Sequence, residues 1–234
     1  MLKEYFKHYI KYIRNLSDRT VGHYITGINT INVILEKYNF PVKNLFEVYN
    51  NDELNNVREF INNNAEFIKK DTVGNRMYSA AFNRFYEFVG EEESYKFLTD
   101  GKLDIIISKP QLTTTKQKSI WKRNQILVEQ VIKSVHYNCE YDNAHKTFTS
   151  KVTGQNYVEG HHLIPMSFQD DFDCNLDIYA NIISLCPICH RLLHHGIANE
   201  KIYVLNKLFD MRCERLKVSG IDFGKSDFLR IVGK

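Results

Sequence analysis

Histidines and cysteines gather in one part of this chain. Seven of the nine His and four of the five Cys lie between His136 and His195. Imidazole nitrogens and thiolate sulfurs are the ligands that zinc and related transition metals prefer in proteins. The sequence therefore predicts that any metal chemistry lies in this stretch.

A catalytic metal could be held by His161, His190 and His194. His190 and His194 are four residues apart, and on a helix that spacing places two imidazoles on one face, where both can reach one ion. His161 could supply a third nitrogen from a strand or loop. Three neutral imidazoles leave coordination positions open for water and a phosphate oxygen, as a catalytic metal requires.

His162 follows His161 directly. Adjacent residues on an extended segment point in opposite directions, so both imidazoles are not expected to bind the same ion. If His161 faces the metal, His162 is free to act as a base. A free imidazole titrates near neutral pH, which suits it to taking a proton from water.

The order of these motifs resembles the HNH endonuclease family, also called ββα-metal or His-Me finger. The similar stretch is 139–195, about a quarter of the chain. It contains Glu-Gly-His-His-Leu-Ile-Pro at 159–165, then Asn181, then Cys-Pro-Ile-Cys-His at 186–190. This pattern is typical of the restriction-type branch, and the Glu-x-His-His start and His-x-x-x-His end also resemble colicin nuclease domains.

The resemblance implies roles for the histidines. His162 would be the general base that activates the attacking water. His161 and His190 would be metal ligands, with His194 a third ligand as in colicins. The divalent metal, Mg²⁺ or a transition metal, would stabilise the phosphorane and the leaving 3′ oxygen. Hydrolysis of a DNA phosphodiester would then give 5′-phosphate and 3′-hydroxyl ends.

Two further catalytic residues are expected from the resemblance. Asn181 would pin the loop between the two strands and help to orient the base. Glu159 would be an accessory carboxylate that orients a histidine rather than binding the metal.

A structural Zn²⁺ site is expected around Cys139, Cys186 and Cys189. Members of the restriction-type branch have an upstream Cys-x-x-Cys, but here Asp142 stands in place of the second Cys. The site could be weak, or lost with its cysteines simply packed. We favour a zinc site whose fourth ligand is one of four residues: Asp142, His136, His145 or Cys174.

Plainer interpretations of the same residues remain open. His161 and His162 could be packed core histidines. His190 and His194 could complete a purely structural zinc site with Cys186 and Cys189. The first is less favoured because Glu159 and Pro165 stand where the nuclease motif requires them, and the second is also less favoured than a catalytic site.

The elements around these motifs predict an α+β protein. Residues 1–100 are expected to form an α-helical domain for DNA recognition or dimerisation, and 101–118 a linker. Residues 119–234 would form the ββα-metal nuclease domain with a helical C-terminal tail. Helices are expected over about 75–89 and 119–135, and a further helix is expected to start at His190. Another is expected after the N-cap candidates Ser17, Asp18 and Thr20, because apolar residues then recur every three or four positions.

Composition fits this interpretation without proving it. Of the 234 residues 43% are hydrophobic and 25% charged, and the net charge is +3. No apolar run is long enough to span a membrane, no signal peptide is recognised, and a cytoplasmic location is expected. Basic residues outnumber acidic ones between Lys102 and Lys133, which would suit a segment that contacts phosphates.

The expected partner is therefore double-stranded DNA, with no membrane partner. A homodimer is expected because two strands need two cuts. Restriction of foreign DNA is the favoured setting, and a homing-type nuclease is the second. The alternative from another functional class is a non-catalytic, zinc-stabilised DNA-binding protein, which would have no need of a free imidazole at His162.

Overall fold

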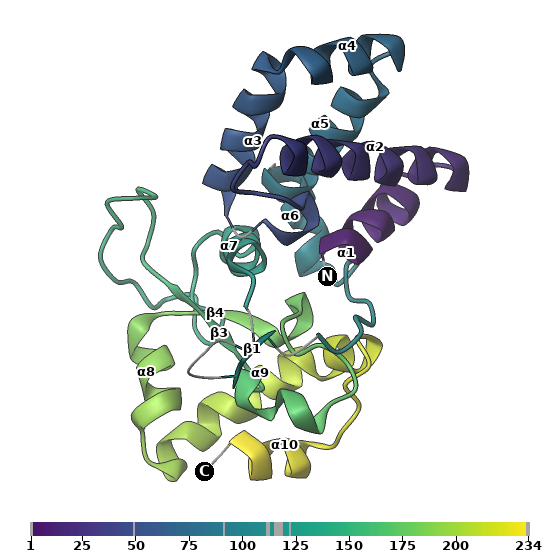
Figure 1. Cartoon of the computed structure of the whole chain (residues 1–234). Helices are drawn as coiled ribbons and strands as arrows, with labels where there is room; N and C mark the ends of the chain where they lie inside the picture. Colours follow the sequence, from purple (N-terminus) through teal and green to yellow (C-terminus); the bar gives the residue numbers. More distant parts are fainter. Residues whose placement is uncertain are drawn as a thin grey trace. The chain divides into compact units, whose positions relative to one another are not determined.

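The computed structural model describes residues 2–48, 50–90, 92–110, 113–114, 119–121 and 123–232. The chain divides into two compact units, Met1–Ser94 and Tyr95–Lys234. The described residues are mostly helical, with small antiparallel sheets, which makes the fold α+β (Figure 1).

The first unit consists of helices and turns. Its elements are α1 (Leu2–His8), η1 (Tyr9–Ile13), α2 (Asp18–Lys37), η2 (Leu45–Glu47), α3 (Asn51–Asn63), α4 (Ala65–Val73) and α5 (Met77–Gly90). α6 (Glu92–Thr99) follows at the boundary between the units. Aromatic rings fill much of the core: Phe6 meets Phe85 edge-on at 5.2 Å and Phe88 at 5.8 Å between ring centroids.

The start of α2 follows the sequence prediction. Of the three cap candidates, Ser17 is the N-cap, and its hydroxyl accepts a hydrogen bond from the Thr20 backbone N–H at 3.2 Å. The buried residues Ile28, Ile31 and Leu35 recur on the face that packs against α5.

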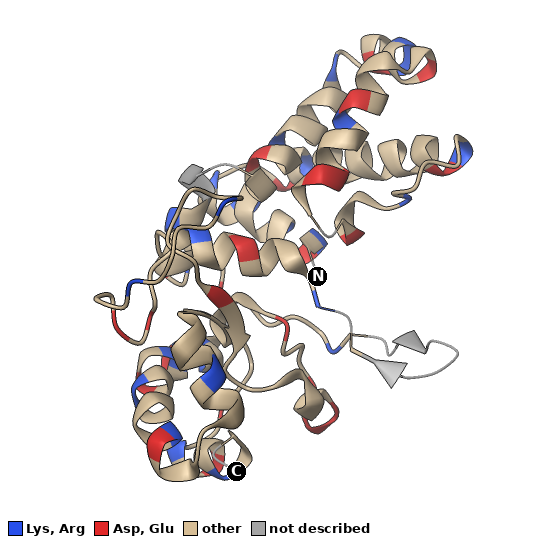
Figure 2. Cartoon of the chain, turned by 90° about the vertical axis from the view of Figure 1, so that its left-hand side faces the viewer, with Lys and Arg blue, Asp and Glu red and all other residues tan. Residues whose placement is uncertain are grey.

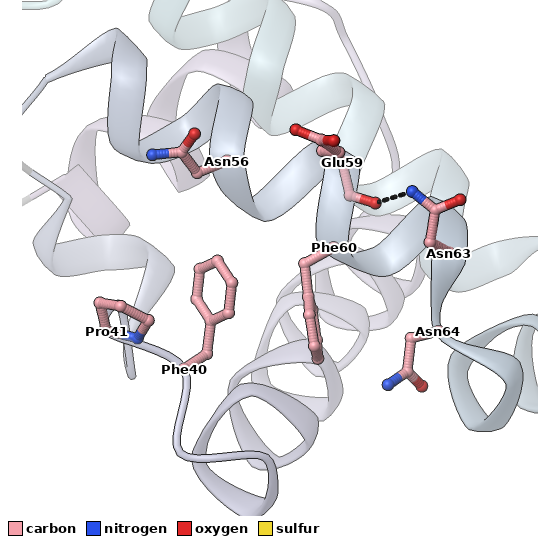
Figure 3. Close-up of a pocket in the computed structure, with 7 residues that line it drawn as sticks. All are labelled: Phe40, Pro41, Asn56, Glu59, Phe60, Asn63 and Asn64. Carbon is pink, nitrogen blue, oxygen red and sulfur yellow. Dashed lines mark hydrogen bonds between the residues drawn. The ribbon is translucent and has the colours of Figure 1, made fainter.

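A hollow of about 480 Å³ opens on the surface of this unit (Figure 3). The rings of Phe40 and Phe60 lie beside it, 4.7 Å apart between centroids. Asparagine and glutamate side chains complete the lining, and the Asn63 amide donates to the backbone carbonyl of Glu59 at 2.9 Å. No His or Cys lines this hollow, so it is separate from the metal-ligand residues.

The second unit contains both described sheets. Its elements are β1 (Thr113–Thr114), β2 (Ser119–Ile120), α7 (Gln125–Ser134), β3 (Glu159–His162), η3 (Met166–Asp171), η4 (Tyr179–Asn181), β4 (Ile182–Leu185), α8 (Pro187–His195), α9 (Ala198–Val218) and α10 (Lys225–Val232). β1 pairs with β2, and β3 pairs with β4, both antiparallel.

The β3–β4 ribbon carries a helix on each face. α7 packs so closely on one face that a Cβ built on Gly160 would lie 2.3 Å from the Val128 side chain. Because side chains alternate along a strand, Glu159 and His161 point to the other face. α8 covers that face and packs against α9 (Figure 1).

Two helices begin at places that the sequence pattern misjudged. The helix expected from 119 starts at Gln125, because the Asn124 side chain caps it by accepting from the Ile126 backbone N–H at 2.9 Å. The helix expected from His190 starts three residues earlier, at Pro187, after Cys186 as N-cap.

The described part of the expected linker packs into the second unit. Leu103 and Ile107 are buried, and Asp104 forms a two-bonded ion pair with Arg215 at 2.6 and 2.9 Å. Residues 111–112 and 115–118 lie outside the described residues.

None of the helices in the described ranges combines the length and apolarity needed to cross a membrane.

Candidate metal centres

Three histidines far apart in sequence come together in the second unit. His161 on β3 and His190 and His194 on α8 each place a ring nitrogen within 4.8 Å of the others. The ring centroids are 5.1, 5.0 and 4.8 Å apart. The Nε2 atoms of His190 and His194 approach to 3.2 Å. We call these residues the histidine cluster, and it is the group that the sequence proposed as metal ligands.

The surroundings of the histidine cluster lower the pKa of two of its rings. Burial, followed by the charges of His190 and His194, lowers the pKa of His161 to about 3. Burial and the neighbouring His190 also lower the pKa of His194. At neutral pH both rings are therefore neutral, with a lone pair for a metal.

Glu159 fixes the orientation of one ring in the cluster. Its carboxylate is hydrogen-bonded to Nδ1 of His190, which leaves Nε2 of that ring facing His194. The other carboxylate oxygen accepts from the Tyr157 hydroxyl at 3.2 Å, and this bond raises the pKa of Tyr157. Carboxylates that hold a ligating histidine in this way set its tautomer and raise its basicity.

The donor set of the histidine cluster fits a divalent transition metal. Imidazole suits Zn²⁺, Ni²⁺, Cu²⁺ and Fe²⁺, and three nitrogens leave part of a coordination sphere open. His161 is buried, whereas His190 is half-buried and His194 is exposed, so the cluster is reached from solvent along α8. An ion held here could meet a ligand from outside.

His162 lies on the opposite side of β3 from His161. Its Nε2 is 2.8 Å from the Asp177 Oδ1 atom, and both side chains are buried. The second oxygen of Asp177 accepts from the backbone N–H of Asn124, at the start of α7, at 2.7 Å. No other hydrogen bond to the His162 ring is found among the described residues.

Asn181 joins the two segments that flank the ribbon. Its amide oxygen accepts from the Ile164 backbone N–H, and its amide nitrogen donates to the carbonyls of Ile164 and Leu176, at 2.8–2.9 Å. These bonds pin the chain that leaves β3 to the chain that enters β4. The residue that contacts the His162 ring is Asp177 rather than Asn181.

A second group of ligands lies at the start of α8. Cys139, His145, Cys186 and Cys189 place one ligand atom each within 4.8 Å of one another. His145 Nδ1 is 3.6 Å from the Cys186 sulfur and 3.4 Å from the Cys189 sulfur. This buried Cys₃His cluster could hold a metal such as zinc, since Cys₃His is a standard structural zinc set.

The structure shows which of the four candidate residues lies close enough to the cysteines to be the fourth ligand. His145 joins the cysteines, and Asp142 lies 3.8 Å from the far nitrogen of its ring. Cys174 instead faces the Gly220 carbonyl, and His136 is exposed. Burial and the neighbouring Cys139 and Cys186 raise the pKa of the Cys189 thiol, so a cation would be needed to hold this sulfur as a thiolate.

Two residues that contact the motif side chains were given no role by the sequence interpretation. Asp177 and Tyr157 carry no motif of their own; Tyr157 could have been suspected because it lies two residues before Glu159, on the same side of an extended chain. Arg123 is exposed, and its charge contributes to the lowered pKa values of His161 and His194.

The described lysines of the basic stretch between Lys102 and Lys133 form ion pairs with acidic residues. Lys102, Lys109 and Lys133 pair with Asp100, Asp170 and Glu129 at 3.6, 3.7 and 4.0 Å. Lys and Arg are interspersed with Asp and Glu on the helices (Figure 2). Lys116, Lys118 and Lys122 lie outside the described residues.

Comparison of the chain with protein-family models, with curated proteins and with solved structures gave no match.

Proposed function

We propose that this chain is a metal-dependent DNA endonuclease of the HNH, or ββα-metal, class. The observation that carries the proposal is the histidine cluster, in which His161, His190 and His194 converge and Glu159 holds His190. Its elements follow the order strand, strand, helix, as β3, β4 and α8. The proposed reaction comes from the resemblance of the motifs to the HNH family. The convergence of the three histidines supports the proposal of a metal site.

In this proposal the substrate is a phosphodiester of double-stranded DNA. A divalent metal in the histidine cluster would supply positive charge to the phosphate and to the leaving 3′ oxygen. The motif resemblance assigns to His162 the uptake of the proton of the attacking water, whose oxygen forms the new bond to phosphorus; in the structure the His162 ring contacts Asp177 on the opposite side of β3 from the histidine cluster, so this role requires the ring to reorient. The bond to the 3′ oxygen breaks, leaving 5′-phosphate and 3′-hydroxyl ends.

The surroundings of the histidine cluster suit an anionic substrate. Arg123 and Arg191 are exposed, and the charges of both contribute to the lowered pKa of His194. Guanidinium groups bind phosphate oxygens through paired hydrogen bonds. Both arginines are therefore proposed to contact the DNA backbone. Restriction of foreign DNA by a homodimer remains the favoured setting.

The test is cleavage of supercoiled plasmid by the full chain with Mg²⁺, Mn²⁺, Co²⁺ or Ni²⁺. His162→Ala and His194→Ala are expected to lower the cleavage rate by at least about 100-fold, because each removes a group needed for the chemistry. His195→Ala is the matched control: His195 lies next to His194 on α8 but outside the histidine cluster.

Failure of the wild type to cut DNA with any of these metals would refute the nuclease proposal. If the protein still binds DNA in that experiment, the non-catalytic zinc-stabilised DNA-binding alternative is favoured. Equal rates for His194→Ala and His195→Ala would remove the histidine cluster from the mechanism.

A further inference from the structure

One phenylalanine of the second unit presents its ring to solvent. Of the 15 phenylalanines, all of which lie in the described ranges, Phe148 alone is exposed, at 62%. Its ring stacks on the ring of Tyr157, with the centroids 4.7 Å apart and the planes 17° apart. Tyr157 covers one face of the Phe148 ring, and the exposed fraction leaves the other face open. A lone exposed apolar side chain is common on protein surfaces, but this one is held in a stack.

A tight turn between Thr147 and Tyr157 fixes the position of the stacked pair. The Tyr157 backbone N–H donates to the Phe148 carbonyl at 2.9 Å. The Asn156 amide oxygen accepts from the Thr147 backbone N–H at 2.8 Å, and its amide nitrogen donates to the Tyr137 carbonyl at 3.0 Å. Because these bonds order the backbone, a ligand that stacks on Phe148 meets a ring already in place and binds at a low cost in entropy.

The turn is positively charged. No Asp or Glu lies between residues 143 and 158, whereas Lys146 and Lys151 lie on either side of Phe148 in the sequence and are exposed. No ion pair of either lysine is found among the described residues. Free ammonium groups beside an open aromatic ring suit a polyanion that also offers flat rings, which is the chemistry of a nucleic-acid strand.

The stacked pair is joined to the histidine cluster by one side chain. The Tyr157 hydroxyl donates to Glu159 at 3.2 Å, and Glu159 contacts Nδ1 of His190. Glu159 raises the pKa of Tyr157, and the charge of Arg191 acts on it in the opposite direction, so that guanidinium also lies near Tyr157. A strand whose phosphate is at the histidine cluster would therefore have its neighbouring bases within reach of Phe148.

We propose that the open face of Phe148 receives a DNA base that is unpaired or displaced from its duplex, next to the phosphate bound at the histidine cluster. Lys146 and Lys151 contact phosphates of the same strand. Every base has a π-face, so the stack tolerates any sequence, and displacing a base costs least where it is already unpaired. The inference rests on the proposed nuclease function and deepens it, because it names DNA with a locally opened step as the preferred substrate.

The test is a fluorescence anisotropy titration of the full chain, without added divalent metal. The two labelled duplexes are identical except for one unpaired adenine. We expect the wild type to bind the duplex with the unpaired adenine about 10-fold or more tightly than the matched duplex. Phe148→Ala should lose this preference, and Phe148→Trp should keep it. Val152→Ala is the matched control, since Val152 is 85% exposed on the same turn but carries no ring.

A second measurement does not depend on the folding of Phe148→Ala. The indole added by Phe148→Trp should lose emission when the duplex with the unpaired adenine binds, because a stacked base quenches it. The wild type, whose one tryptophan is Trp121, gives the reference signal. Unchanged emission from the added indole in the bound complex would overturn the inference.

The remaining outcomes separate this inference from the nuclease proposal. A wild type that cuts plasmid but binds both duplexes equally, or an undiminished preference in Phe148→Ala, would overturn the inference alone. A wild type that binds neither duplex and cuts no plasmid would overturn both. Self-association that is lost in Phe148→Ala, with DNA binding unchanged, would assign the ring to a contact between copies of the chain and would also overturn the inference.

Discussion

The Glu159 side chain links strand β3 to His190 on α8, within the histidine cluster. Its carboxylate contacts Nδ1 of His190 and accepts from the Tyr157 hydroxyl. The sequence interpretation expected an accessory carboxylate that orients a histidine, and the geometry identifies His190 as the ring it contacts. The effect of Glu159 should therefore be visible in metal affinity as well as in activity.

Glu159→Gln is expected to weaken metal binding at the histidine cluster by about 10- to 100-fold, because the amide no longer fixes and polarises the His190 ring. Titration of the zinc-loaded protein with Mn²⁺ or Ni²⁺ measures this. Tyr157→Phe is the matched control, since it removes only the bond to the far carboxylate oxygen. An unchanged affinity in Glu159→Gln would show that the carboxylate does not act through the metal.

At the scale of elements, the metal-ligand residues depend on how closely α7 and α8 pack on the β3–β4 ribbon. Gly160 lies between Glu159 and His161, and its lack of a side chain allows α7 to approach. The start of α8 lies beside the Cys₃His cluster, with Cys186 as its N-cap. Both features can be tested without measuring catalysis.

Gly160→Ala is expected to destabilise the protein by about 1–3 kcal/mol, because its Cβ would lie 2.3 Å from the Val128 Cγ1 atom. Urea unfolding measures the change. Gly22→Ala is the control, since nothing lies within 4 Å of a Cβ at that helical position, and it should be neutral or stabilising. Val128→Ala should rescue Gly160→Ala, and additive effects of the two changes would contradict this contact.

Cys189→Ser is expected to release bound zinc and to lower the free energy of unfolding by about 4 kcal/mol or more, as loss of a structural metal does. Metal analysis after gel filtration and thermal unfolding are the measurements. Cys213→Ser is the control, because that half-exposed thiol lies outside the Cys₃His cluster. Zinc retained by Cys189→Ser would rule out this cluster as the zinc site.

At the scale of the whole molecule, both ligand clusters belong to the second unit. The first unit has its own aromatic core and its own surface hollow. All of the candidate metal ligands found among the described residues therefore come from one unit.

A fragment of residues 92–234, which keeps α6 intact, is expected to fold and to bind metal at both clusters with nearly the affinity of the full chain. Its ligands come only from residues 139–194. Circular dichroism and metal titration test this, with the full chain as the reference. A fragment that is unfolded in the presence of zinc would show that the first unit is needed for the second.

The residues that could bind a metal could be identified from the sequence alone. The spacing of His190 and His194 predicts one helical face, and the structure brings both to His161 as expected. Helix α2 and its Ser17 cap were also predicted correctly, since caps and apolar periods are local properties. The start of α7 was misjudged, because Asn124 caps the helix only in the fold. Leu103, in the expected linker, is buried in the second unit, which no local pattern indicated.

The long-range contacts of the metal-ligand residues and of His162 could be identified only in the tertiary structure. His145 was one of four expected ligands, and only the chain path brings it, rather than Cys174, to the cysteines. The bond between His162 and Asp177 spans 15 residues, and Asp177 reaches the start of α7 across 53 residues. Contacts of this kind depend on how helices and strands pack, so no local pattern encodes them.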